Sequence, residues 1–173
     1  MKNNRTLKIS LLGILTALTT VATIIIVIPI PSTDGYVNFG DTIIFLTACL
    51  MGGVPAMLVG GIGSALADLI VAPHWAIFTL VIKSIEGLLA GLLMSAFKML
   101  PSALSKLIAL FIAALWMVLG YYFAGAIMYG WAGSLASVPM NLLQAGVSLV
   151  LGFALWITLS KIKPLNNVLE RLK

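Results

Sequence analysis

Residues 42–72 read TIIFLTACLMGGVPAMLVGGIGSALADLIVA, an apolar tract interrupted by Gly52, Gly53 and Pro55. A membrane-spanning helix needs about 20 residues, so this tract is long for one span and short for two. The choice between one helix and two sets the number of spans. It also sets which basic residues share a side of the membrane.

The whole chain has the composition of a membrane protein. Of its 173 residues, 61% are apolar and 9% are charged, and the mean hydropathy is +1.15, which is outside the usage of ordinary soluble proteins. Further apolar spans are expected at residues 7–30, 76–97, 107–129 and 138–160. We therefore expect one all-α integral membrane domain over residues 1–173, with room for about six helices and for no soluble catalytic domain.

The basic residues favour two helices in the 42–72 tract. With six spans, nine of the ten basic residues lie on one side, as the positive-inside rule requires. These nine are Lys2, Arg5, Lys8, Lys98, Lys106, Lys161, Lys163, Arg171 and Lys173. We therefore predict six transmembrane helices with both termini in the cytoplasm. Because this topology explains the charges, the pI of about 9.6 does not indicate nucleic-acid binding.

Four polar side chains interrupt the later spans: Lys83 and Glu86 in one, Asn141 and Gln144 in another. Such groups are unfavourable at membrane depth and usually face a cavity, a ligand or each other. The three-residue spacing places both members of a pair on one helix face, so Lys83 and Glu86 can form an ion pair. We expect both pairs to line a pocket open to the outside. The alternative is that they only neutralise each other and join helices.

Aromatic residues extend this candidate pocket. Trp75 lies just before the 76–97 span, and Tyr121 lies deep in the next one. For Trp75 the alternative is membership of an aromatic belt at the membrane interface. Either Tyr121 or Tyr122 is expected to turn its hydroxyl into the protein, because lipid offers that group no partner.

The predicted outer side also carries a polar loop over residues 31–41, rich in turn-forming residues. Asn38 and Asp41 belong to this loop. Asp68, near the end of the 42–72 tract, is expected to cap its helix or to pair locally.

Several kinds of chemistry lack the residues that they require. The single cysteine, Cys49, cannot form an intrachain disulfide, and the single histidine, His74, is too little for a His-based metal site. The sequence contains neither a Gly-x-x-x-x-Gly-Lys phosphate loop nor a Gly-x-Ser-x-Gly nucleophile motif. We therefore expect no metal, no cofactor and no enzymatic activity, and any ATP must be hydrolysed by a partner.

A set of short motifs occurs in the order and spacing of a known family. The motifs are Val37–Asp41 (VNFGD), Ala67–Leu69 (ADL), Lys83-x-x-Glu86-Gly87 with Gly91, Gly120–Phe123 (GYYF) and Pro139-x-Asn141-x-x-Gln144. Over nearly its whole length the chain resembles the S components of energy-coupling factor (ECF) transporters, six-helix membrane proteins that capture vitamins in bacteria and archaea. The pattern is similar to the branch assigned to hydroxymethylpyrimidine or pyridoxine, although related sequences have been labelled riboflavin transporters.

The resemblance implies a multi-pass protein of the bacterial plasma membrane that binds a vitamin from outside and closes its first loop over it. It also implies docking on a transmembrane T component that carries two ATP-binding subunits. Gly13 and Ala17 form a smooth face on the first span. They occupy the place of the family's Ala-x-x-x-Ala docking surface, with glycine replacing the first alanine.

A pyrimidine or pyridine with hydroxymethyl groups suits the polar and aromatic residues described above. Amide side chains offer donor and acceptor together, aromatic rings can stack on the ligand, and the charged pair can hold hydroxyls or an amine. The expected substrate-binding residues are Asn141, Gln144, Lys83, Glu86, Trp75, Tyr121, Asn38 and Asp41. The alternatives are a riboflavin-specific S component, a membrane assembly subunit that binds no small molecule, and a carrier that works alone as a homodimer.

Overall fold

The computed structural model describes residues 2–172, and the side chains of residues 4–170. The chain is predominantly helical and carries one short β-hairpin. The elements in order are α1 (Lys2–Ile24), β1 (Ile28–Ile30), β2 (Gly35–Val37), α2 (Gly40–Met51), α3 (Gly53–Val71), the 3₁₀ turn η1 (Pro73–Trp75), α4 (Ala76–Ala96), α5 (Ser102–Leu159) and α6 (Lys163–Leu172).

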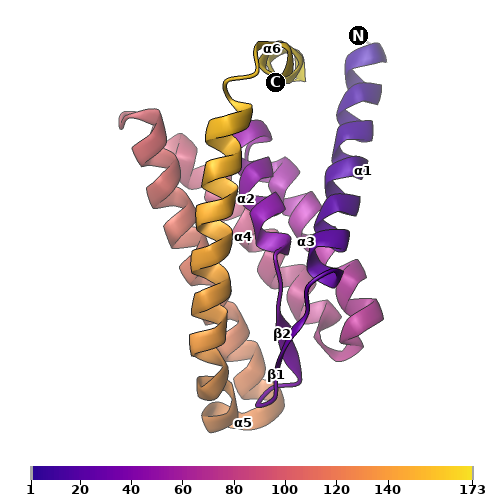
Figure 1. Ribbon diagram of the computed structural model, residues 1–173, viewed down its shortest axis with the longest axis vertical. Helices are drawn as coiled ribbons and strands as arrows, with labels where there is room; N and C mark the ends of the chain where they lie inside the picture. Colours follow the sequence, from indigo (N-terminus) through magenta and orange to yellow (C-terminus); the bar gives the residue numbers. More distant parts are fainter. Residues whose placement is uncertain (1, 173) are drawn as a thin grey trace.

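Helix α5 is two helices joined at Gly130. The backbone angles of this glycine, φ 79° and ψ 162°, are not helical, and glycine adopts such positive φ values without a steric penalty. Figure 1 shows that the chain reverses here, so the 102–129 arm and the 131–159 arm run antiparallel. The two arms correspond to the spans predicted at 107–129 and 138–160, and each begins earlier than predicted.

The predicted division of the 42–72 tract is confirmed. Helix α2 ends at Met51, and Gly52 follows with φ 89° before α3 begins at Gly53. Helix α3 then packs very closely on α4, because a Cβ at Gly91 would lie only 2.0 Å from the backbone nitrogen of Gly53. Small residues thus allow two backbones to touch, as is common for helices in lipid.

Within the described residues, four helices are long and apolar enough to cross a membrane. They are α1 from Asn4, α3, α4 with its preceding 3₁₀ turn, and the double helix α5. Helix α2 has 12 residues and is shorter than a usual span. Many large apolar side chains of the long helices are exposed on the outside of the bundle, as lipid-facing residues would be. The all-α membrane class is therefore supported, and the number of six spans stays a prediction.

The first predicted span was placed wrongly at its end. Helix α1 stops at Ile24 rather than at residue 30, and Ile28–Ile30 forms β1. Prolines at 29 and 31 disfavour a helix at these positions, because proline lacks a backbone N–H. Strand β1 pairs antiparallel with β2, with Ile28 opposite Val37, so part of the predicted loop at 31–41 is ordered as a hairpin.

The hairpin and the termini lie at opposite ends of the bundle (Figure 1). The start of α1, the connection between α4 and α5, the end of α5 and helix α6 all lie at one end, and α6 runs across the bundle axis. At the other end the hairpin folds back between the helices, and Ile30 and Val37 are buried.

Candidate functional site

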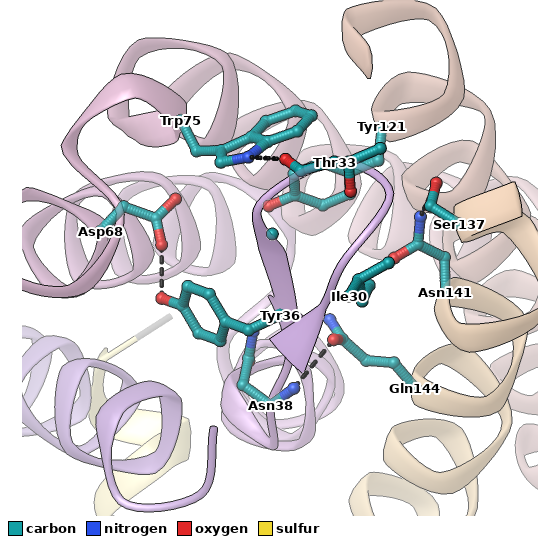
Figure 2. A pocket seen from close by; sticks show the side chains of 11 residues that line it. Ile30, Thr33, Tyr36, Asn38, Asp68, Trp75, Tyr121, Ser137, Asn141 and Gln144 are labelled. Carbon is teal, nitrogen blue, oxygen red and sulfur yellow. Dashed lines mark hydrogen bonds between the residues drawn. The ribbon is translucent and has the colours of Figure 1, made fainter. Parts of the chain in front are cut away.

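A cavity lies where the hairpin meets the helices. Its volume is about 30 Å³, which is room for one or two water molecules. The lining residues come from the hairpin, α3, η1 and both arms of α5. They are Ile30, Thr33, Gly35, Tyr36, Asn38, Asp68, Trp75, Tyr121, Ser137, Asn141 and Gln144 (Figure 2).

Three hydrogen bonds hold the hairpin over this cavity, each to a different helical element. Trp75 Nε1 donates to the Thr33 carbonyl oxygen at 3.1 Å, and the Tyr36 hydroxyl donates to Asp68 Oδ1. The Asn38 backbone N–H donates to Gln144 Oε1 at 2.9 Å. Figure 2 shows all three bonds around the hairpin. The hairpin is therefore a cover that is fastened on several sides.

The Tyr36 hydroxyl stays protonated in this arrangement and can act as a hydrogen-bond donor. Burial raises the pKa of Tyr36 above its ordinary value, and the nearby Asp68 carboxylate raises this pKa further. The hydroxyl therefore keeps its proton at every physiological pH and can donate it to Asp68. Asp68 was expected to cap its helix or pair locally, and that expectation was wrong because its partner lies 32 residues earlier in the chain.

Aromatic rings form one wall of the cavity. Trp75 is only 4% exposed, so its assignment to an interfacial belt does not hold. The centre of its ring lies 5.6 Å from the centre of the Tyr121 ring in an edge-on arrangement. Its ring also stacks on Tyr129, with the two ring centres 6.1 Å apart. The Tyr121 hydroxyl turns inward and shares a 2.9 Å hydrogen bond with Thr79 Oγ1. This wall can support the face of a flat ring.

Asn141 and Gln144 form a second wall of the cavity, in the 131–159 arm. This helical arm begins at residue 131, so Asn141 lies about 15 Å along it at 1.5 Å per residue. Asn141 Nδ2 lies 3.4 Å from Ser137 Oγ. Gln144 bonds to the hairpin, as described above, and its Nε2 donates to Asp41 Oδ2 at 2.8 Å.

A buried ion network lies behind this wall. The Lys83 ammonium pairs with Asp41 Oδ1 and lies 3.1 Å from Glu86 Oε2, which confirms the predicted pairing of Lys83 with Glu86. All three side chains are at most 1% exposed, and Lys83 also lies 5.3 Å from the centre of the Tyr121 ring. Neither Glu86 oxygen accepts a well-aligned hydrogen bond from the described residues.

The structure thus divides the eight predicted substrate-binding residues into two groups. Five line the cavity: Asn38, Trp75, Tyr121, Asn141 and Gln144. The three charged residues Asp41, Lys83 and Glu86 lie outside the lining, although Asp41 bonds to Gln144 and Lys83 lies over the Tyr121 ring. Their assignment to the ligand stays a prediction.

Comparison with known proteins assigns the chain to a family. A family model described as "ECF-type riboflavin transporter, S component" matches residues 3–161. The chain is an ECF S component. It is therefore a transporter subunit that belongs to a family of vitamin or vitamin-precursor transporters, and not an enzyme of a usual kind.

Two relatives cover most of this S component. An "uncharacterized protein in gap 3'region" of Pyrococcus woesei is 39% identical over 142 residues, which are 82% of this chain and 94% of the relative. The "thiamine precursor transporter HmpT" of Lactococcus lactis subsp. cremoris (strain MG1363) is 35% identical over 153 residues. That match covers 87% of this chain and 86% of HmpT.

The predicted docking residues of the S component lie on α1. Gly13 and Ala17 are both exposed, and the position of a Cβ at Gly13 has open space around it. The same side of α1 meets α3 two turns further on, where Thr20 Oγ1 donates to the Gly63 carbonyl at 2.9 Å. Gly13 and Ala17 themselves are exposed within the described part of the chain, and docking on them stays a prediction.

Sequence reasoning missed several lining residues of the S component. Tyr36, Asp68, Thr33 and Ser137 line the cavity but were not assigned to the site. Asp68 carried a usable signal, because it is a carboxylate inside an apolar tract. The others are ordinary loop and helix residues whose role depends on how the hairpin folds back.

Proposed function

We propose that this S component captures a small heteroaromatic vitamin or precursor from outside the cell, with hydroxymethylpyrimidine or pyridoxine as the ligand. The observation that carries the proposal is the cavity under the hairpin. It combines an aromatic wall with amide and hydroxyl groups and the Asp68 carboxylate, and no lysine or arginine is among the described residues that line it. Such a site suits a flat, neutral ring that carries donors and acceptors.

The polar groups are placed to contact the edge of a ring whose face lies on the aromatic wall. Asn141 offers both a donor and an acceptor, and Ser137 and Tyr121 add hydroxyls. Asp68 supplies a carboxylate that suits an exocyclic amine or a hydroxymethyl donor. Each of these groups can form a hydrogen bond with a neutral ring, so the ligand does not need to carry a charge.

A single ring requires less rearrangement of the hairpin than riboflavin, the ligand in the family's name. The cavity of about 30 Å³ holds only water-sized molecules, so entry of any ring requires the hairpin to move outward. A three-ring flavin with its ribityl chain requires a much larger displacement. The name of the HmpT relative, a thiamine precursor transporter, supports the same choice.

We further propose six membrane spans with both termini in the cytoplasm and the hairpin outside. Eight of the nine basic residues predicted to lie inside belong to the start of α1, the α4–α5 connection with the first turns of α5, and the end of α5 with α6, all at one end of the bundle (Figure 1). The ninth, Lys173, lies outside the described residues. This grouping agrees with the positive-inside rule. The proposed partners are a transmembrane T component, docked on Gly13 and Ala17, and two ATP-binding subunits.

The proposal is tested by calorimetry on the purified chain in detergent, with hydroxymethylpyrimidine, pyridoxine, thiamine and riboflavin as ligands. We expect submicromolar binding of hydroxymethylpyrimidine or pyridoxine, and much weaker binding of the other two. Tight binding of riboflavin alone would replace the proposed ligand. Absence of binding to all four, by protein shown to be folded, would overturn the proposal in favour of an assembly subunit.

A further inference from the structure

The side-chain amide of Gln144 is engaged at both ends. Its oxygen accepts a hydrogen bond from the Asn38 backbone N–H at 2.9 Å, and its nitrogen donates to Asp41 Oδ2 at 2.8 Å. Gln144 is only 3% exposed, so water does not compete for these bonds. Both ends of this amide are therefore held by protein partners, although each end keeps one further hydrogen-bonding position.

These two bonds connect the hairpin with the buried ion network. Asn38 directly follows β2, whereas Asp41 lies in the first turn of α2 and pairs with Lys83 of α4 through its other oxygen. Gln144 comes from the 131–159 arm of α5. Figure 2 shows its side chain turned toward Asn38. One residue therefore links the end of the hairpin to three helices.

The short segment between the two bonded positions is itself rigid. Asn38 Oδ1 accepts a hydrogen bond from the Gly40 backbone N–H at 2.9 Å, a local turn that fixes the step from β2 to α2. A Cβ on Gly40 would lie 2.2 Å from Thr23 Oγ1, so this turn is pressed against α1. If Asp41 or Gln144 shifts, we therefore expect Asn38 at the end of the hairpin to shift with it.

Asn141 lies one helical turn from Gln144 and has a different environment. Among the described residues its side chain makes a single hydrogen bond, of 3.4 Å to Ser137 Oγ, which is longer than the usual range of about 2.7–3.2 Å. We infer that Gln144 is a positioning residue that fastens the hairpin to the ion network, while Asn141 provides the amide that contacts the ligand. The assignment of Asn141 rests on the proposed function; that of Gln144 does not.

Hydrogen–deuterium exchange of the ligand-free protein tests the positioning role of Gln144, with Asn141 as the comparison. We expect Gln144→Leu to accelerate exchange of the backbone amides of residues 28–38 by about tenfold, the effect of losing a buried hydrogen bond. The matched variant Asn141→Leu should leave that exchange within about twofold of the wild type. Unchanged hairpin exchange in Gln144→Leu, or an equal increase in both variants, would overturn the inference.

A charge exchange between positions 41 and 144 gives a second test that keeps the buried polar groups. Gln144→Glu alone sets two carboxylates against each other and should accelerate exchange in the hairpin. The double variant Asp41→Asn/Gln144→Glu keeps the total charge, and it allows the asparagine amide to donate to the new carboxylate. Exchange in the double variant should return toward the wild-type rate, and failure to recover would contradict the role of this contact. Both tests use no ligand, so they remain decisive even if none of the four vitamins binds.

Discussion

At the scale of single residues, Asn141 is the side chain on which the proposed ligand contact depends most. It lines the cavity and has unused hydrogen-bonding capacity. We predict that Asn141→Ala weakens vitamin binding by about tenfold or more, because a buried ligand group then loses its partner. Calorimetry measures this effect. Leu142→Ala is the control, since Leu142 is 47% exposed on the outside of the same arm, and an equal loss in both variants would remove Asn141 from the site.

Tyr36 gives a prediction about alkaline pH. Its pKa in the folded protein is raised by burial and by Asp68, whereas in the unfolded chain it is about 10. The stability that the phenol contributes is therefore fully present below about pH 10 and is lost as pH rises toward the folded-state pKa. The unfolding temperature of the wild type should exceed that of Tyr36→Phe near pH 8, and this advantage should shrink above about pH 10. A constant difference across that range would count against the Tyr36–Asp68 contact.

Parts of the site are predictable from single residues, and other parts are not. Lys83, Glu86, Asn141 and Gln144 stand out because polar groups are rare in apolar spans. The pairing of Asp41 with Lys83 spans 42 residues and its contact with Gln144 spans 103. No local pattern encodes such separations, so only the fold reveals that Asp41 joins the buried network.

At the scale of elements, breaks in the helices were easier to predict than the structure that fills them. Adjacent glycines at 52 and 53 indicated that the long tract divides, and α2 and α3 confirm it. The end of the first helix was predicted less well, because α1 stops at Ile24 and not at residue 30, next to the prolines at 29 and 31. The hairpin itself was not predicted, because its strands have three residues each and are defined by pairing with each other rather than by a periodic pattern.

The reversal inside α5 yields a prediction about stability. Gly130 has φ 79°, and a Cβ added there would have nothing within 4 Å. A substitution therefore strains the backbone but causes no steric clash. We expect Gly130→Ala to lower the free energy of unfolding by about 1–2 kcal/mol. Gly146→Ala is the control, because Gly146 is also uncrowded but lies within the second helical arm of α5. Thermal unfolding should show a loss of stability for Gly130→Ala only. An equal stability of the two variants would show that residue 130 does not require the positive φ of glycine.

At the scale of the whole molecule, the ligand cavity and the predicted docking surface are separate. The cavity lies at the hairpin end, whereas Gly13 and Ala17 are exposed residues of the middle part of α1 and do not line the cavity. The all-α membrane architecture follows from the composition. The inward fold of the hairpin, which makes the cavity, does not.

This separation predicts that docking and binding can be disrupted independently. Gly13→Leu with Ala17→Leu should abolish co-purification with a T component and vitamin uptake, because bulky side chains prevent close approach of two helices. Vitamin affinity of the isolated variant should stay within about twofold of the wild type, since neither residue lines the cavity. Replacement of the neighbouring exposed residue Leu18 by alanine serves as the control. Normal uptake by the double variant would exclude this face as the docking surface.

We expect the fastened hairpin to limit how fast a ligand can be captured. A two-stranded hairpin is marginally stable alone, so this one depends on its three anchors to the helices. It can therefore open by local unfolding while the bundle stays intact. If the ligand enters only through the open form, its apparent affinity is reduced by the fraction of time that form is populated. Capture is then a gated encounter, and its speed is set by the opening of the backbone rather than by diffusion to the membrane.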